Sequence, residues 1–140
     1  MAHALLDTGA VALVNRDDRK HDVGAEWFRG FRGTLLTTAA VVTETAYVLG
    51  ASPAHQRAAL LWFERARASG LLKVEPVADY AALARIMAQY ADLPCDYAGA
   101  SLIALAEQAS VAGIATVDQR NFSVYRVRGR RRFRILLCRG

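Results

Sequence analysis

Short apolar runs alternate along this chain with longer segments of helical periodicity, and this alternation constrains the fold more than any other feature of the sequence. Five apolar runs are interpreted as buried strands, namely 4–6, 35–37, 72–75, 113–117 and 133–136. Helices are predicted between them, over 21–31, 38–49, 53–68, 79–90 and 96–109, with a further helix directly after the first strand. Strands joined by crossover helices lie parallel in one sheet. The sequence therefore predicts an α/β fold, with a central parallel sheet of four to five strands and helices on both faces.

The chain has the length and composition of a single globular domain over residues 1–140. Of its residues, 54% are hydrophobic, and no linker, repeat or low-complexity tract interrupts them. A core of this size needs no metal or disulfide merely to fold, so a bound ion would serve chemistry. The longest apolar runs fall far short of the roughly 20 residues that cross a bilayer, which argues against a membrane anchor. Asp7 interrupts the apolar part of any signal peptide, and Cys95 and Cys138 match no metal or redox spacing, so we expect a cytoplasmic protein.

Positive charge is concentrated at the C-terminal end. Residues 120–140 hold eight arginines and neither Asp nor Glu, which gives this tail a formal charge of +8 against −3 for residues 1–119. Such a tail attracts polyanions, including nucleic acid, by binding their phosphates. The arginines that are candidates for holding nucleic-acid phosphates are Arg120, Arg126, Arg128, Arg130, Arg131 and Arg132. A solvated surface strand is the alternative interpretation of the same residues.

Four acidic residues stand where a parallel sheet would bring them together. Asp7 ends the first predicted strand and Asp118 follows the fourth, and sites in such folds lie at the carboxyl ends of the strands. Glu44 lies inside an otherwise apolar helix, and Asp96 lies just after Pro94 at the start of another. Taken singly, the aspartates could instead cap the element that follows, and the glutamate could face solvent.

Taken together, the four carboxylates indicate a divalent cation, because they would otherwise repel one another. A set of carboxylates without His or Cys selects the hard ions Mg²⁺ or Mn²⁺, which act on phosphate oxygens and activate water. The three histidines, His3, His21 and His55, are expected in surface or capping roles. A phosphatase of the aspartyl-phosphate type is disfavoured, because Asp7 lacks the second aspartate two residues on that would serve as acid and base.

Four segments occur in a characteristic order, namely LLDTGAVALVNRDDRKHDVGAEWF, TTAAVVTETAYVLG, YADLPCDYAGASLIALAE and IATVDQRNFSVYR. Together they resemble the PIN domain and, among its branches, the toxin ribonucleases of VapBC toxin–antitoxin modules. The resemblance implies a three-layer α/β sandwich that cleaves RNA with Mg²⁺ or Mn²⁺. It also implies a homodimer and a cognate antitoxin protein as partner. The implied catalytic acids are Asp7, Glu44, Asp96 and Asp118, with Asp7 and Asp118 as metal ligands.

Several apolar and aromatic residues of the predicted helices have two possible roles, in the core or in binding. Leu60, Leu61, Trp62 and Phe63 are expected to point into the core. If they do not, the apolar face around Trp27, Trp62 and Phe63 is a candidate surface for the second subunit or the antitoxin. Tyr97 or Tyr125 is a candidate for stacking on a base, with core packing as the plainer alternative.

One position departs from the pattern of that family. Most members carry an aspartate, a central metal ligand, where this chain has Gly99, and often a second acid where it has Asn121. The missing ligand is expected to weaken metal binding and activity severely, with Asp96 one helical turn earlier as a partial substitute. Either the residue was changed or selected in a cloned copy, or the chain is a natural, non-catalytic PIN-like protein that binds RNA or a partner. The retained acids favour a ribonuclease crippled at position 99, with the binding protein as the alternative.

Overall fold

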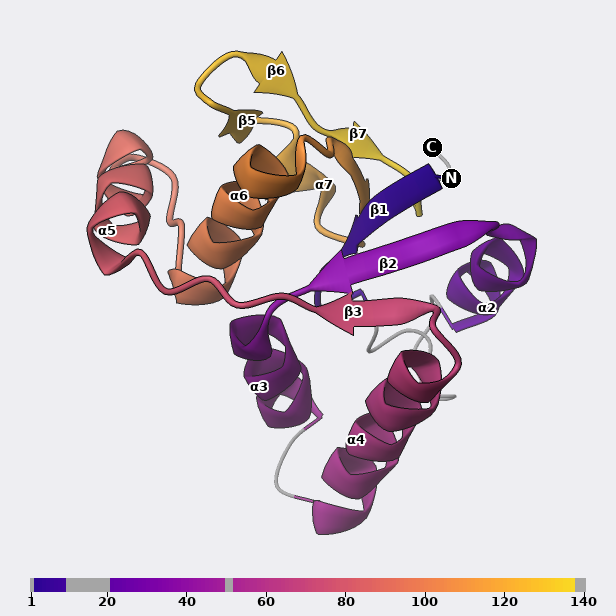
Figure 1. Ribbon diagram of the computed structural model, residues 1–140. Coiled ribbons are helices and arrows are strands. Elements are labelled where there is room, and N and C mark those ends of the chain that lie inside the picture. The colour runs from indigo at the N-terminus through magenta and orange to yellow at the C-terminus, as the bar shows by residue number, and fades with distance from the viewer. Residues whose placement is uncertain (1, 10–20, 50–51, 138–140) are drawn as a thin grey trace.

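A parallel sheet of five strands forms the middle layer of the protein (Figure 1). The computed structural model describes residues 2–9, 21–49 and 52–137. The strands lie in the order β3-β2-β1-β4-β7. Their bounds are β1 Ala2–Leu6, β2 Gly33–Thr37, β3 Leu72–Val74, β4 Gly113–Ala115 and β7 Arg134–Ile135. In the register of the sheet, Leu5 of β1 stands opposite Leu36 of β2 and Ile114 of β4, which confirms the predicted parallel architecture.

Helices cover both faces of this sheet, which makes the fold a three-layer α/β sandwich (Figure 1). They are α2 His21–Gly30, α3 Ala39–Val48, α4 Pro53–Ala68, α5 Tyr80–Gln89, α6 Tyr97–Ala109 and the short α7 Gln119–Phe122. Successive residues of β1 point to opposite faces, so that Leu5 packs in the core beneath α6 while Leu6 packs in the core on the side of α4. The helix predicted directly after the first strand, together with Gly50 and Cys138, lies outside the described residues.

Local capping signals determine where several helices begin. The side chains of Thr38, Asp79 and Asp96 accept hydrogen bonds from backbone N–H groups in the first turns of α3, α5 and α6. Each such bond satisfies one of the donors that a helix start leaves unpaired. The predicted starts of these three helices are therefore confirmed.

Among the described residues, no helix is long and apolar enough to cross a membrane.

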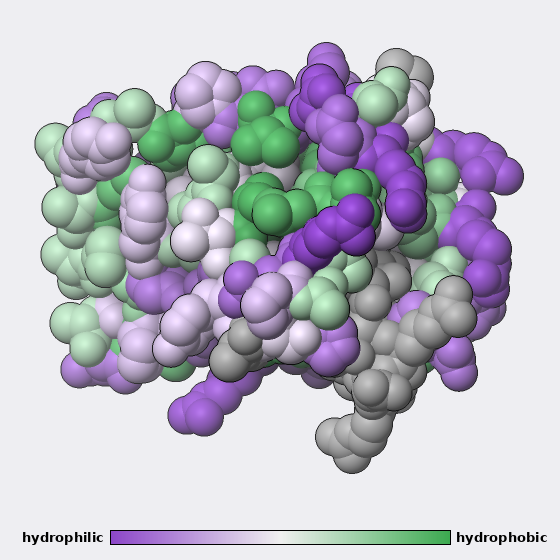
Figure 2. Space-filling model, turned by 90° about the horizontal axis from the view of Figure 1, so that it is seen from below, coloured by the Kyte–Doolittle hydropathy of each residue, from purple (hydrophilic) through white to green (hydrophobic). Residues whose placement is uncertain are grey.

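The prediction that the apolar run of α4 points into the core is wrong for two of its members. Leu60 and Leu61 are exposed, Trp62 is half-buried, and only Phe63 is buried. A helix turns by about 100° per residue, so four consecutive side chains cannot all face one side. Figure 2, which views the molecule from below, shows hydrophobic residues lying among hydrophilic ones on this face of the surface. The Trp62 ring packs edge-on against Phe28 and Phe63, which confirms the core role of Phe63.

A small antiparallel hairpin, absent from the predicted elements, precedes the last strand of the sheet. It pairs β5 Arg126–Val127 with β6 Arg131–Arg132 through a tight turn at Arg128 and Gly129, both with positive φ. The backbone N–H of Arg128 donates to Glu107 Oε1 at 3.0 Å, and its guanidinium donates to the Glu107 carbonyl at 3.1 Å. Val127 is buried in the core beside α6. The hairpin is therefore fastened to the C-terminal half of α6.

Candidate functional site

The four predicted acids line one pocket of about 210 Å³ at the carboxyl edge of the sheet. Each comes from a different element, since Asp7 follows β1, Glu44 lies on α3, Asp96 precedes α6 and Asp118 follows β4. Gly99 and Asn121 line the same pocket. The parallel topology brings these positions together, as expected from strands that end at one edge. What each residue does there stays a prediction.

Asp7 is the most buried of the four acids, with 5% of its surface exposed. The Thr116 hydroxyl donates to Asp7 Oδ2 at 2.8 Å and accepts from the backbone N–H of Asp118 at 3.0 Å. Burial raises the pKa of Asp7, the charges of Asp118 and Asp96 add to that, and hydrogen bonds from Thr116 and the Thr8 backbone oppose it. Thr116 thus fixes Asp7 and links it to the loop that carries Asp118.

Glu44 and Asp96 interact directly across the pocket through a hydrogen bond between their side chains. Burial is the main reason that the pKa of Glu44 rises to about 7, and the hydrogen bond to Asp96 and the charges of Asp96 and Asp7 raise it further. A hydrogen bond with Thr8 has the opposite, smaller effect. Near neutral pH Glu44 therefore holds a proton for part of the time.

Asp96 and Asp118 also cap the helices that follow them, so the plainer interpretation of these two residues is confirmed. Asp96 Oδ1 accepts from the backbone N–H of Gly99 at 2.8 Å. Asp118 Oδ1 accepts from the backbone N–H of Asn121 at 3.0 Å, and its Oδ2 accepts from the Asn121 side-chain amide at 2.9 Å. Each carboxylate oxygen has more than one acceptor site, so capping leaves these groups able to bind a cation as well.

Gly99 is the third residue of α6, and its missing side chain would point into the pocket. A Cβ atom at this position would lie 3.2 Å from Asp96 Oδ1, 3.7 Å from Cys95 Sγ and 3.8 Å from Tyr125 Cε2. The first of these distances requires the Asp96 carboxylate to move by a few tenths of an ångström. A longer side chain at position 99 would therefore enter the acidic pocket next to Asp96.

Behind the pocket, a chain of buried hydrogen bonds joins α3 to α6. The Thr38 hydroxyl accepts from the backbone N–H of Val41 at 3.3 Å and lies 2.8 Å from the Ser101 hydroxyl, which donates to the Ala98 carbonyl at 2.7 Å. Since Ser101 uses its only proton on Ala98, Thr38 donates to Ser101. This link sets the position of the helix with Glu44 relative to the helix that follows Asp96. Sequence reasoning missed Ser101, whose only signal was a hydroxyl in an apolar helix.

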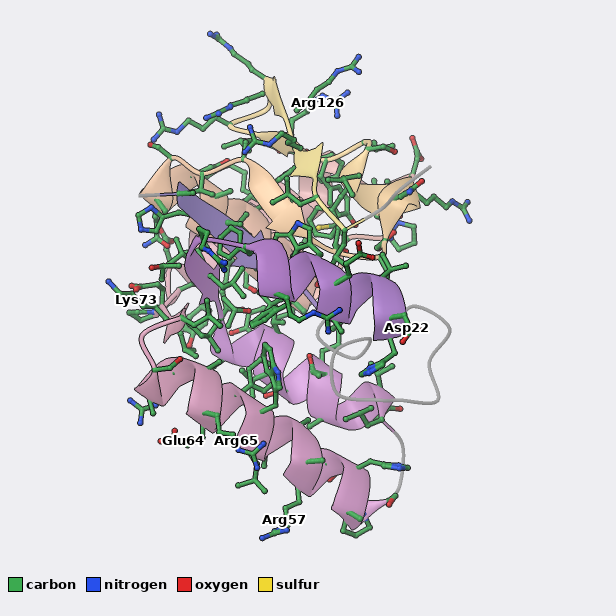
Figure 3. All side chains as sticks on the ribbon, turned by 90° about the vertical axis from the view of Figure 1, so that its right-hand side faces the viewer. Asp22, Arg57, Glu64, Arg65, Lys73 and Arg126 are labelled. Carbon is green, nitrogen blue, oxygen red and sulfur yellow. The ribbon has the colours of Figure 1, made fainter. Side chains whose placement is uncertain are left out.

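The structure separates the tail arginines into two groups. Arg126 donates to the carbonyls of residues 123–125 at 2.8 to 3.0 Å, and Arg128 is bound to Glu107. Arg128 is nevertheless exposed, as are Arg134 and the other four candidate arginines, Arg120, Arg130, Arg131 and Arg132. Long side chains project from the hairpin end of the molecule, where Arg126 is labelled in Figure 3. Glu107 lies eleven residues after Asp96, which is about 16 Å along a helix, so the turn of the hairpin at Arg128 is remote from Asp96. The first strand of the hairpin, in contrast, directly follows Tyr125, which lines the acidic pocket.

The two tyrosines considered for base stacking differ in exposure. Tyr125 is buried, and its hydroxyl donates to the Pro94 carbonyl at 2.8 Å. Its ring therefore belongs to the core and is not available to a base, which confirms the plainer interpretation of this residue. Tyr97, the first residue of α6, is exposed.

The donors of the pocket suit a hard divalent cation in type, although they do not form a closed metal site. All four acids offer oxygen, and no positively charged residue of the described chain lines the pocket. Within residues 2–9, 21–49 and 52–137, no group of three or more His, Cys, Asp or Glu side chains is arranged to hold a metal ion. Asp96 and Asp118 are turned toward helix starts, and Gly99 offers no ligand. The residues thus fit Mg²⁺ or Mn²⁺ chemically, with an incomplete set of ligands.

Comparisons with known proteins agree with this geometry. The family model of the PIN domain matches residues 4–128. Among solved structures, VapC20 from Mycobacterium tuberculosis, described as a Sarcin-Ricin loop cleaving toxin, matches with a TM-score of 0.73. The match has 19% sequence identity and covers 85% of this chain and 92% of that chain, so it is a likeness of fold. No curated protein matches the chain.

Proposed function

The chain belongs to the PIN domain family, and on this premise we propose that it is a metal-dependent ribonuclease of the VapC toxin type that hydrolyses RNA phosphodiesters in the cytoplasm. The observation that carries the proposal is the convergence of Asp7, Glu44, Asp96 and Asp118 in one pocket without a positively charged lining residue among those described. Such a cluster gains stability from a divalent cation, and hard cations act on phosphate oxygens.

Asp7 and Asp118 would hold Mg²⁺ or Mn²⁺, and Glu44 and Asp96 would complete the site through water. The ion, when bound, polarises the phosphodiester and activates water for attack. Thr116 holds Asp7 in place through its 2.8 Å hydrogen bond. Glu44, with a pKa of about 7, is able to accept a proton from water at neutral pH.

The exposed arginines of the tail would bind the phosphates of the RNA. Arg120 lies two residues after Asp118, whereas Arg130, Arg131 and Arg132 lie on the hairpin. Arg126 and Arg128 are occupied by protein carbonyls, but each guanidinium has five N–H donors and keeps some for phosphate. Because the turn of the hairpin is held at Glu107, about 16 Å along α6 from Asp96, an RNA that contacts both places must extend over several nucleotides.

Gly99 would reduce activity strongly, because it removes one anionic ligand from the pocket. The test is cleavage of total RNA with Mn²⁺ by this chain and by its Gly99→Asp variant, with Gly99→Asp/Asp7→Asn as the control. We expect strong cleavage by Gly99→Asp alone. Equal, weak activity of all three proteins would contradict the catalytic proposal.

The second candidate is a non-catalytic PIN-like protein that binds RNA or a partner. It is favoured by Gly99 and by the incomplete ligand set among the described residues. In that case Gly99→Asp would fail to cleave RNA while RNA binding persisted.

A homodimer and a cognate antitoxin protein complete the proposal, together with the expectation that residues 1–140 act as one domain. The dimer and the antitoxin partner are inferred from the VapC type of the PIN domain family. The half-buried Trp27 and Trp62 are the candidate contact residues, since the first stacks on Phe31 and the second packs on Phe28.

A further inference from the structure

The arginine hairpin, residues 126–132, has little stability of its own. Each of its strands, β5 and β6, has only two residues, and an isolated two-stranded hairpin is marginally stable at best. Arg126 stands directly opposite Arg132 in the register, and like charges at such positions repel each other. The conformation of the hairpin therefore depends on contacts with the rest of the protein.

The turn of the hairpin adds a conformational cost at Arg128. Arg128 and Gly129 have φ angles of 54° and 71°, and across them the backbone N–H of Arg130 donates to the Val127 carbonyl at 3.1 Å. A positive φ suits glycine, whereas in other residues it brings the Cβ atom close to a backbone carbonyl oxygen. An arginine keeps such a conformation only where surrounding interactions compensate for it.

Side chains from two helices hold one edge of β5. The hydroxyl of Tyr90, the residue that ends α5, accepts a hydrogen bond from the backbone N–H of Arg126 at 2.9 Å. Oε1 of Glu107, on α6, accepts from the backbone N–H of Arg128 at 3.0 Å. Residues two apart on a strand direct their N–H groups to the same edge, so these two side chains take the place of a neighbouring strand (Figure 1).

Glu107 binds the backbone of Arg128 rather than its charge. The guanidinium of Arg128 donates at 3.1 Å to the Glu107 carbonyl, which is one of the last four carbonyls of α6 and has no partner within the helix. In the described part of the chain, Glu107 forms no ion pair with an arginine of the hairpin. Its carboxylate therefore fixes the turn without forming an ion pair that would compete with phosphates for the guanidinium groups.

We propose that Tyr90 and Glu107 are positioning residues for RNA binding, because they hold the arginine hairpin in the conformation that presents its guanidinium groups to phosphates. This inference rests on the proposed function and specifies how the chain binds its RNA. A segment that is ordered beforehand loses less conformational freedom when it binds. The held hairpin therefore binds phosphates more tightly than a mobile tail with the same charge.

A purely electrostatic role of Glu107 predicts the opposite sign. Removal of a negative charge next to the hairpin would then strengthen RNA binding, and it would do so equally in Glu107→Ala and Glu107→Gln. A positioning role predicts weaker binding by the Ala variant only, because glutamine keeps an oxygen that accepts from Arg128. Tyr90→Phe tests the second contact without any change of charge, since it removes the hydroxyl and keeps the ring that contacts Tyr125.

The experiment measures binding of a fluorescein-labelled twenty-nucleotide oligoadenylate by anisotropy, in EDTA so that no cleavage occurs. Glu107→Ala and Tyr90→Phe should each weaken binding roughly 3- to 30-fold, the range expected when the hairpin loses one of its hydrogen bonds to the body of the protein. Glu107→Gln should bind at least as tightly as the unmodified protein. Tyr80→Phe should bind normally, because Tyr80 is an exposed residue at the opposite end of α5 from Tyr90.

Two further measurements separate displacement of the hairpin from a general loss of stability. The slope of log binding constant against log salt concentration should become less steep in Glu107→Ala and Tyr90→Phe, since fewer phosphates are neutralised, and should stay unchanged in Glu107→Gln. The backbone amides of residues 126–132 should exchange hydrogen faster in the two weakened variants, while those of β1 and β4 should keep their protection. Loss of protection throughout the domain in both weakened variants would overturn the inference.

Equal effects of Glu107→Ala and Glu107→Gln, in either direction, would also overturn the inference, as would normal binding by Tyr90→Phe. Failure of the unmodified protein to bind the oligoadenylate would overturn it too. Mn²⁺-dependent cleavage of total RNA by Gly99→Asp reports the proposed function separately. If that cleavage occurs while Glu107→Ala binds RNA normally, only the inference about positioning fails. If Gly99→Asp does not cleave RNA while the other variants bind as expected, the catalytic proposal fails and the positioning of the hairpin stands.

Discussion

Replacing Glu44 by glutamine should stabilise the metal-free protein above neutral pH. In the folded chain, burial and the neighbouring carboxylates raise the pKa of Glu44 from 4.5 to about 7. The folded state therefore keeps a proton that the unfolded state releases, and stability falls as the pH rises from 4.5 to 7. Glutamine carries no charge at any of these pH values and can still hydrogen-bond to Asp96, so it should avoid that loss.

The size of the effect follows from the shift in pKa. A rise of 2.5 units, from 4.5 to about 7, corresponds to an upper bound of about 3 kcal/mol. Glu44 is only half-buried, and solvent screening reduces this bound to about 1–2 kcal/mol. The difference between the two proteins should be fully developed at pH 8 and close to zero at pH 4.5. Asp7, whose pKa is also raised, should leave some pH dependence in the variant.

The assay is urea denaturation in EDTA at several pH values between 4.5 and 8, because urea adds no salt to screen the charges. Asp92→Asn removes one negative charge at an exposed position and serves as the control. Mn²⁺ should stabilise the unmodified protein more than it stabilises the Glu44→Gln variant, because the cation neutralises the Glu44 carboxylate and the variant has no charge at this position. A destabilised Glu44→Gln protein at pH 8, or a difference that does not change with pH, would refute the reasoning.

Four further predictions concern the ligands, the buried hydrogen bonds, the tail and the assembly. Gly99→Asp should bind Mn²⁺ more tightly by calorimetry, and unchanged affinity would show that position 99 is not a ligand. Thr38→Val and Ser101→Ala should each lower the free energy of unfolding by about 1–2 kcal/mol, and a double-mutant cycle should show that they are coupled rather than additive. Reversing the charges of residues 130–132 should weaken binding to all RNAs alike. The slope of log binding constant against log salt concentration should become less steep by about 0.7 for each phosphate that the tail no longer neutralises. An unchanged slope would mean that the tail does not touch RNA. Light scattering at micromolar concentration should give a dimer, and a monomer alone would contradict that part of the proposal.

The sequence by itself determined the strands of the main sheet, the long helices of the described residues and the meeting of the acids, but not the β5–β6 hairpin. Thr38, Asp79 and Asp96 mark helix starts because a capping side chain bonds to backbone only two or three residues away, which is a local interaction. Crossover helices force the strands to run parallel, and parallel strands end at one edge, so Asp7 and Asp118 had to converge. Both inferences need only short-range chemistry and chirality.

The tertiary structure alone decided how the residues at the site act on one another. The raised pKa of Glu44, to which Asp96 contributes, and the link from Thr38 to Ser101 depend on how closely α3 approaches α6 and the residue before it. The turn of the hairpin attaches to Glu107, near the C-terminal end of α6, and so holds Arg128 away from the acids. These features follow from interactions between segments far apart in the chain. Such interactions depend on how whole helices and strands pack against one another, and the hydrophobic periodicity of a single segment does not predict that packing.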